Sequence, residues 1–96
     1  MAAAHQVALT WIASTDVVAG YNVYRSTNPP GNEGATPINP ALITGLAYTD
    51  LAVSAGEKVG YVVTAVSSQG VESVHSVEAD ATVPIFPPTG LVAVAS

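Results

Sequence analysis

The chain has 96 residues, a net charge of -5 and no cysteine, and its only basic side chains are Arg25 and Lys58. Nucleic-acid binding needs clustered lysine and arginine to replace phosphate counterions, so two isolated cations exclude it, and a polybasic membrane contact fails for the same reason. No apolar run approaches the roughly 20 residues of a membrane-spanning helix. The lack of cysteine excludes disulfides and thiolate metal sites. This length predicts one domain with one core.

The composition favours strands over helices. Most apolar residues are alanine and valine, threonine is common, and glycine and proline recur along the chain. No stripe of apolar residues at helical spacing is sustained, so we predict an all-β fold. In chain order the expected strands cover residues 6–12, 21–25, 36–39, 47–50, 59–66 and 76–83. Their close spacing leaves no room for parallel crossovers, which predicts antiparallel sheets.

Alternation within these segments predicts which side chains face the core. In residues 6–12 the inward set is Val7, Leu9 and Trp11, and in residues 21–25 it is Tyr21 and Val23. The segment 59–66 is the most strand-like of all. In residues 76–83 the expected inward set is Val77, Ala79, Ala81 and Val83. Turns are expected at the Asn-Pro-Pro-Gly run of residues 28–31 and around Gly56 and Gly70.

Four stretches in register resemble a fibronectin type III domain of bacterial secreted proteins. They are Val7-Ala8-Leu9-Thr10-Trp11, Gly20-Tyr21-Asn22-Val23-Tyr24-Arg25-Ser26, Tyr48-Thr49-Asp50, and Tyr61-Val62-Val63-Thr64-Ala65-Val66 followed by Gly70-Val71-Glu72-Ser73. Their order and spacing agree over nearly the whole of residues 6–83. The resemblance implies an immunoglobulin-like antiparallel Greek-key sandwich with Trp11 buried. It also implies an extracellular or cell-surface location.

The chain departs from this family pattern in two places. The family usually carries a corner tyrosine six residues before the alanine of its sixth strand, here Ala65, and Val59 occupies that position, whereas Tyr61 lies two residues further on the same face. The opening Pro-Pro-x-x-Leu strand does not precede Val7, whereas residues 87–95 resemble such a strand. We therefore expect residues 1–84 to form a sandwich that lacks its first strand. Residues 85–96 are expected to form a linker and the first strand of a following or neighbouring module.

Two interpretations of this C-terminal strand remain open. In the first, the chain is a slice of a tandem repeat array. In the second, Leu91, Val92, Ala93 and Val94 of one copy pair beside Val7 and Leu9 of the next, which gives a head-to-tail assembly. Completion within one chain is disfavoured, because the connector 84–88 reaches only about 17 Å and an eight-residue strand spans about 27 Å.

The sequence predicts no catalytic, cofactor or metal site. His75 and Ser76 are neighbours on an expected strand, so their side chains point to opposite faces and do not form a nucleophile–base pair. The aspartates Asp16, Asp50 and Asp80 lie in separate segments, without the spacing of a calcium loop. Asp50 is expected to bond the backbone of a turn.

One surface patch is predicted from the outward positions of two neighbouring strands: Tyr24, Val62 and Val66. The leading functional hypothesis is a non-catalytic structural or interaction module. It would be either a spacer in a multidomain extracellular protein or a self-assembling protomer, and its partners would be other protein modules, including copies of itself. The alternative is a carbohydrate- or cell-surface-binding accessory module of a secreted enzyme.

Overall fold

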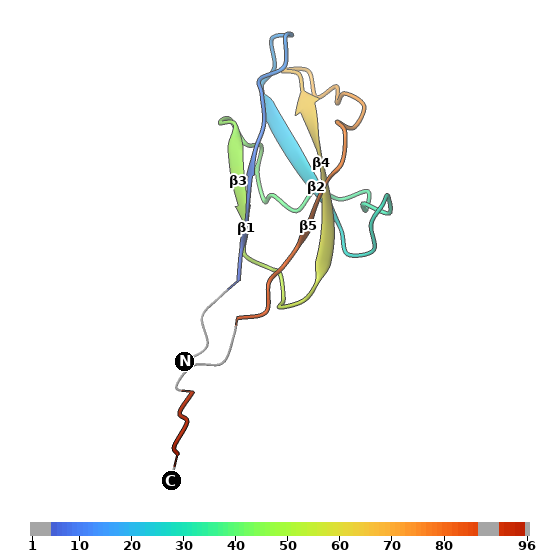
Figure 1. Cartoon of the computed structure of the whole chain (residues 1–96). Coiled ribbons are helices and arrows are strands. Elements are labelled where there is room, and N and C mark those ends of the chain that lie inside the picture. The colour runs from blue at the N-terminus through green and yellow to red at the C-terminus, as the bar shows by residue number, and fades with distance from the viewer. Residues whose placement is uncertain (1–4, 87–90, 96) are drawn as a thin grey trace.

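The computed structural model describes residues 5–86 and 91–95 and contains two antiparallel sheets (Figure 1). Strands β1 and β3 form the first sheet, and the second has the order β2-β4-β5. The strand bounds are Val7–Thr10 for β1, Gly20–Ser26 for β2, Ala47–Asp50 for β3, Lys58–Val66 for β4 and Ala79–Thr82 for β5. The predicted all-β, antiparallel two-sheet fold is therefore confirmed.

The core lies between the two sheets. Its fully enclosed members are Val23, Val59, Tyr61 and Val83, and the side chains of Val7, Leu9 and Trp11 pack against them from β1 and its end. The inward positions predicted for the first two strands are thus the ones that reach the core. Gly56 and Gly70 have φ angles of 78° and 83°, a left-handed conformation that glycine adopts without steric cost, and both lie at the predicted turns.

Residues 36–39 do not form the predicted strand. The Ile38 N–H donates to the Val23 carbonyl at 2.8 Å, and the Asn39 side-chain oxygen accepts from the Val23 N–H at 2.8 Å. A side-chain amide therefore takes the place of a strand backbone beside β2. Pro37 lies within this segment and Pro40 follows it, and neither has an N–H to donate, which prevents a regular ladder.

Strand β5 is shorter than the predicted strand 76–83, because serine side chains replace its first backbone pairs. The Ser73 and Ser76 hydroxyls each accept an N–H from β4, those of Ala65 and Val63, both at 2.9 Å. Each of these serines also donates its own N–H to the carbonyl of the same β4 residue. Val77 is 94 % exposed, so its predicted inward position is wrong.

The predicted exposed patch of Tyr24, Val62 and Val66 is also wrong. The three side chains do occupy the outward face of β2 and β4, yet they are only 5 %, 4 % and 8 % exposed. Residues 72–76 cross this face: the Tyr24 hydroxyl donates to the Glu72 carboxylate, and the His75 ring lies against the Tyr24 ring.

The loop after β2 covers the same face near the start of β4. The Gly31 N–H donates to the Glu78 carboxylate at 2.8 Å, and a Cβ added at Gly60 would meet that carboxylate at 2.9 Å. The Glu78 side chain therefore lies over Gly60, on the face that carries Val62. Strand β4 is consequently buried on both sides.

Candidate functional site

Within the part of the chain that the structure describes, strand β1 has a partner on one edge only. Its register pairs Leu9 with Tyr48, and the Trp11 N–H donates to the Leu46 carbonyl at 3.1 Å. Because successive residues of an antiparallel strand direct their amides to opposite edges, the backbone of Ala8 and Thr10 faces away from β3. No strand among residues 5–86 and 91–95 pairs with this side of β1, which we call the free edge.

A groove of about 210 Å³ opens beside the far end of β1. Trp11 and Ile12 line it from the residues just after β1, Val63 and Ala65 from β4, and Val74 from the segment before β5. We call it the Trp11 groove. The inward-facing Val63 and Ala65 are only half-buried, whereas the outward-facing Val62 and Val66 are buried. The interior of the sandwich is therefore more open here than its covered exterior.

The Trp11 side chain has one unsatisfied polar atom. Its ring packs edge-on against Tyr21, with centroids 5.7 Å apart, and the Tyr21 hydroxyl accepts from the Ser14 N–H at 2.9 Å. The indole Nε1–H of Trp11 is buried and finds no acceptor among the described residues. Buried indole donors normally have a partner, so this one marks an incomplete part of the packing.

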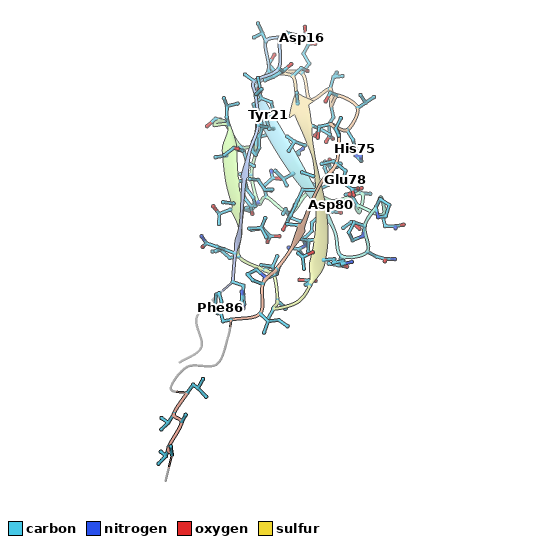
Figure 2. All side chains as sticks on the ribbon, in the orientation of Figure 1. Asp16, Tyr21, His75, Glu78, Asp80 and Phe86 are labelled. Carbon is cyan, nitrogen blue, oxygen red and sulfur yellow. The ribbon has the colours of Figure 1, made fainter. Side chains whose placement is uncertain are left out.

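Residues 91–95, called here the C-terminal segment, carry the other half of the predicted self-association site. Leu91, Val92 and Val94 are 94 %, 76 % and 88 % exposed, Ala93 is also exposed, and Figure 2 shows these side chains projecting into open space. The predicted acceptors Val7 and Leu9 are half-buried in β1. Within one chain the two halves are not brought together. Residues 87–90 of the predicted strand lie outside the described residues.

The start and the end of the sandwich's chain lie at the same pole of the sandwich. The His5 and Phe86 rings stack with centroids 4.0 Å apart, beside the start of β1, and Figure 2 shows Phe86 where the chain leaves β5. The other imidazole, His75, packs on Tyr24. Neither histidine hydrogen-bonds a serine or a carboxylate, and no group of three or more metal-ligating side chains occurs in the parts of the chain described.

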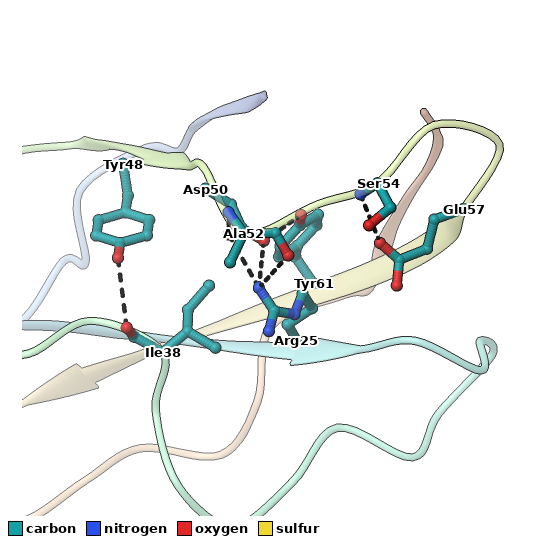
Figure 3. Close-up of polar contacts among 8 residues, drawn as sticks. All are labelled: Arg25, Ile38, Tyr48, Asp50, Ala52, Ser54, Glu57 and Tyr61. Atoms are coloured by element: carbon teal, nitrogen blue, oxygen red, sulfur yellow. Dashed lines mark hydrogen bonds and ion pairs between the residues drawn. The ribbon is translucent and has the colours of Figure 1, made fainter. Parts of the chain in front are cut away.

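Sequence reasoning missed a buried charged cluster that joins the two sheets (Figure 3). Arg25 donates Nη1–H bonds to both Asp50 carboxylate oxygens at 2.9 and 2.8 Å, and the Tyr61 hydroxyl donates to Oδ2 at 2.7 Å. The Ala52 N–H donates to Oδ1 at 3.0 Å, so the predicted bond from Asp50 to a turn is confirmed. We call these residues the Asp50 cluster.

The cluster shifts the ionisation of its members. Burial opposes the charge on Asp50, but the bonds from Arg25, Tyr61 and Ala52 outweigh burial and hold the pKa of this carboxyl below its ordinary value. Burial, followed by the bond to Asp50, raises the pKa of Tyr61. The hydroxyl of Tyr61 thus bonds β4 to β3, although Val59 occupies the position of the family's corner tyrosine. The available signal was Arg25 itself, which shares the inward phase of Tyr21 and Val23.

Comparisons with known proteins place this sandwich in a family. No model of a known protein family matches the chain. A solved structure, an Fn3-like protein from Clostridium thermocellum, superposes with a TM-score of 0.70 at 41 % identity, covering 86 % of this chain and 81 % of that one. The chain belongs to the fibronectin type III-like family. The resemblance read from its strands is thereby confirmed.

A second relative of this Fn3-like domain is a segment of a far longer protein. An amylopullulanase from Thermoanaerobacter thermohydrosulfuricus is 40 % identical over 82 residues, which make up 85 % of this chain. The matched part is 5 % of the length of the amylopullulanase. Among the residues described for the Fn3-like domain, no helix is long and apolar enough to cross a membrane.

Proposed function

We propose that this Fn3-like domain is a non-catalytic accessory module that links other modules of an extracellular polysaccharide-processing enzyme. A counterpart of this domain makes up 5 % of the length of the amylopullulanase, so nearly all of that protein lies outside the matched segment. The linking role requires a self-contained fold, and the Asp50 cluster together with the enclosed core supplies one.

The burial of the aromatic side chains favours a linker over a carbohydrate-binding module. Sugar rings are held by exposed aromatic platforms, and here Tyr21, Tyr24 and Tyr61 are buried while Trp11 and Tyr48 are half-buried. Phe86 is 47 % exposed, but one face of its ring is stacked on His5. The residues that would bind a glucan chain are thus used inside the domain.

Native electrophoresis in gels cast with and without pullulan or amylopectin tests this proposal. The expected result is the same mobility, relative to a non-binding reference protein, for the wild-type chain and for Phe86→Ala. Retardation of the wild type that Phe86→Ala abolishes would reject the linker in favour of a glucan-binding module. As a second measure, excess maltooligosaccharide should leave the thermal midpoint unchanged, because a ligand that binds the folded state raises it.

The free edge of β1 and the exposed C-terminal segment favour a second candidate for the same role. In it, copies of this chain join head to tail as a self-assembling protomer. The partners would then be other modules of the same kind. The division into a sandwich at 1–84 and a linker plus strand at 85–96 is part of this proposal.

A further inference from the structure

We propose that the Trp11 groove receives Leu91 of a second copy of this chain, whose C-terminal segment adds a strand to the free edge of β1. This inference rests on the proposed linking function and names the surfaces that would carry out the linking. The inference combines three features of the described residues. They are the free edge of β1, the open apolar Trp11 groove beside it, and the apolar, extended C-terminal segment, which does not pack against its own sandwich.

The free edge supplies the hydrogen bonds for such an added strand. The backbone groups of Ala8, Thr10 and Ile12 point away from β3, and an exposed edge of this kind is a template for strand addition. The C-terminal segment contains no proline and no charged side chain between Leu91 and Ala95. Its extended length of about 17 Å matches the length of β1 together with Trp11.

The groove supplies the apolar contact. Its volume of about 210 Å³ is comparable with the ~150 Å³ of an apolar cavity that holds a benzene ring, so it has room for a leucine side chain. Leu91 would contact the half-buried Val63 and Trp11 and would cover inward faces that the sandwich leaves open. An incoming strand also brings backbone carbonyls to the groove that Trp11 lines, where its indole N–H has no acceptor.

The opposite face of the added strand also finds apolar neighbours. Alternation places Val92 and Val94 on the side away from the core, where β1 carries Ala8 and Thr10 and the chain continues to Ile12. Ile12 is 93 % exposed and Val74, on the other side of the groove, is 89 % exposed. Cross-strand pairs of β-branched side chains stabilise a sheet. These exposed apolar side chains therefore gain partners on both faces of the added strand.

The occupant is a second copy because the segment and the groove remain apart within one chain. Leu91 is 94 % exposed, and the chain leaves the sandwich beside His5, at the opposite end of β1 from Trp11. Donor and acceptor are different surfaces, so the contact is heterologous and repeats from copy to copy. Assembly would grow with concentration until the copies close a ring or form a filament.

Sedimentation velocity with matched variants tests this inference. The wild-type chain should form larger species as its concentration rises. Leu91→Asp should weaken association roughly 10- to 100-fold, because it removes a buried leucine from the contact. Val17→Asp makes the same change at a side chain that is 97 % exposed in the loop between β1 and β2, and it should associate like the wild type.

A mixing experiment tests the head-to-tail geometry. Ala8→Pro removes an amide from the free edge and leaves the bonds to β3 in place, so this variant keeps its donor segment and loses its acceptor. Leu91→Asp keeps the acceptor and loses the donor. Each variant alone should stay monomeric, and the mixture should stop at one-to-one dimers, with a shift in emission from Trp11, the only tryptophan.

Two outcomes would overturn the inference: a mixture that stays monomeric while both variants unfold cooperatively, or a Leu91→Asp chain that associates like the wild type. The proposed function fails by a different result. Retardation in a glucan gel would reject the linker role without bearing on strand addition, whereas monomeric mixtures would reject strand addition and leave the non-catalytic role in place.

Discussion

The Asp50 cluster provides the sharpest test of what holds the two sheets together. Asp50→Asn removes the charge that accepts two bonds from Arg25 and one from Tyr61. Removing one partner of a buried ion pair costs about 3–5 kcal/mol. The lower end applies because the side chain left without its charged partner, Arg25, is 23 % exposed, although that of Asp50 is only 4 % exposed. We therefore expect a loss of about 3 kcal/mol.

A loss of this size is easily measured. A domain of this length has a free energy of unfolding of roughly 5–14 kcal/mol, and each kcal/mol lowers the thermal midpoint by about 4–8 °C. Urea unfolding of Asp50→Asn should show a loss of about 3 kcal/mol, and circular-dichroism melts should show a thermal midpoint lower by roughly 12–24 °C. Asp16→Asn is the control, since Asp16 is exposed in the loop between β1 and β2, and it should stay within about 0.5 kcal/mol of wild type.

The same variant predicts a pH dependence with a fixed sign. The folded state lowers the pKa of Asp50, and the unfolded value is about 3.9, so the contribution of Asp50 is fully present above that pH. It is lost as the pH falls through the folded pKa. The stability gap between wild type and Asp50→Asn should be constant from neutral pH to about pH 5 and shrink below about pH 4. A gap under about 1 kcal/mol at neutral pH, or one that does not shrink in acid, would refute this reasoning.

Three further predictions concern packing and hydrogen bonding. Tyr24→Ala should lower the free energy of unfolding by about 3 kcal/mol in urea titrations, because the ring is buried. A change within about 0.5 kcal/mol is typical of an exposed side chain and would contradict the burial of Tyr24. Gly20→Ala should cost about 1–3 kcal/mol, since its Cβ would lie 2.9 Å from the Ile43 carbonyl oxygen. Gly60→Ala should cost less, because the Cβ meets the ends of the Asp80 and Glu78 side chains, which can rotate away; equal melting points for the two variants would contradict this difference. Ser76→Ala should cost about 1 kcal/mol and speed amide exchange at Val63, whose N–H loses its acceptor, and unchanged exchange there would show that the hydroxyl is dispensable.

Alternation in the sequence predicted most of the strands and of their inner faces, but it also predicted a strand at residues 36–39 that does not form and an inward Val77 that is exposed. The period of two placed Leu9 and Val23 toward the core, and the structure confirms both positions. Alternation separates the two faces of a strand but does not say what covers the outer one. The cover over Tyr24 is an irregular, polar stretch at residues 72–76. For this reason the sequence could not distinguish a buried outer face from an exposed patch.

Long-range polar contacts were the other limit of the sequence. Arg25 and Asp50 are 25 residues apart, and neither position alone indicates its partner. The serine hydroxyls that replace backbone pairs at the start of β5 belong to the same class, since Ser73 and Ser76 are also typical turn residues. The candidate site was half predictable: its donor and acceptor strands follow from the resemblance, whereas the Trp11 groove depends on how residues 73–76 are placed.

Residue-resolved amide exchange by NMR, at low and at high concentration, tests the free edge of β1 most directly. In dilute solution the amides of Ala8 and Thr10 should exchange fast while that of Leu9, which faces β3, is protected. At high concentration Ala8 and Thr10 should gain protection in the wild type and not in Leu91→Asp. Protection of Ala8 and Thr10 in dilute solution, or exchange that does not change with concentration, would contradict the claim that the free edge of β1 pairs with the C-terminal segment of another copy.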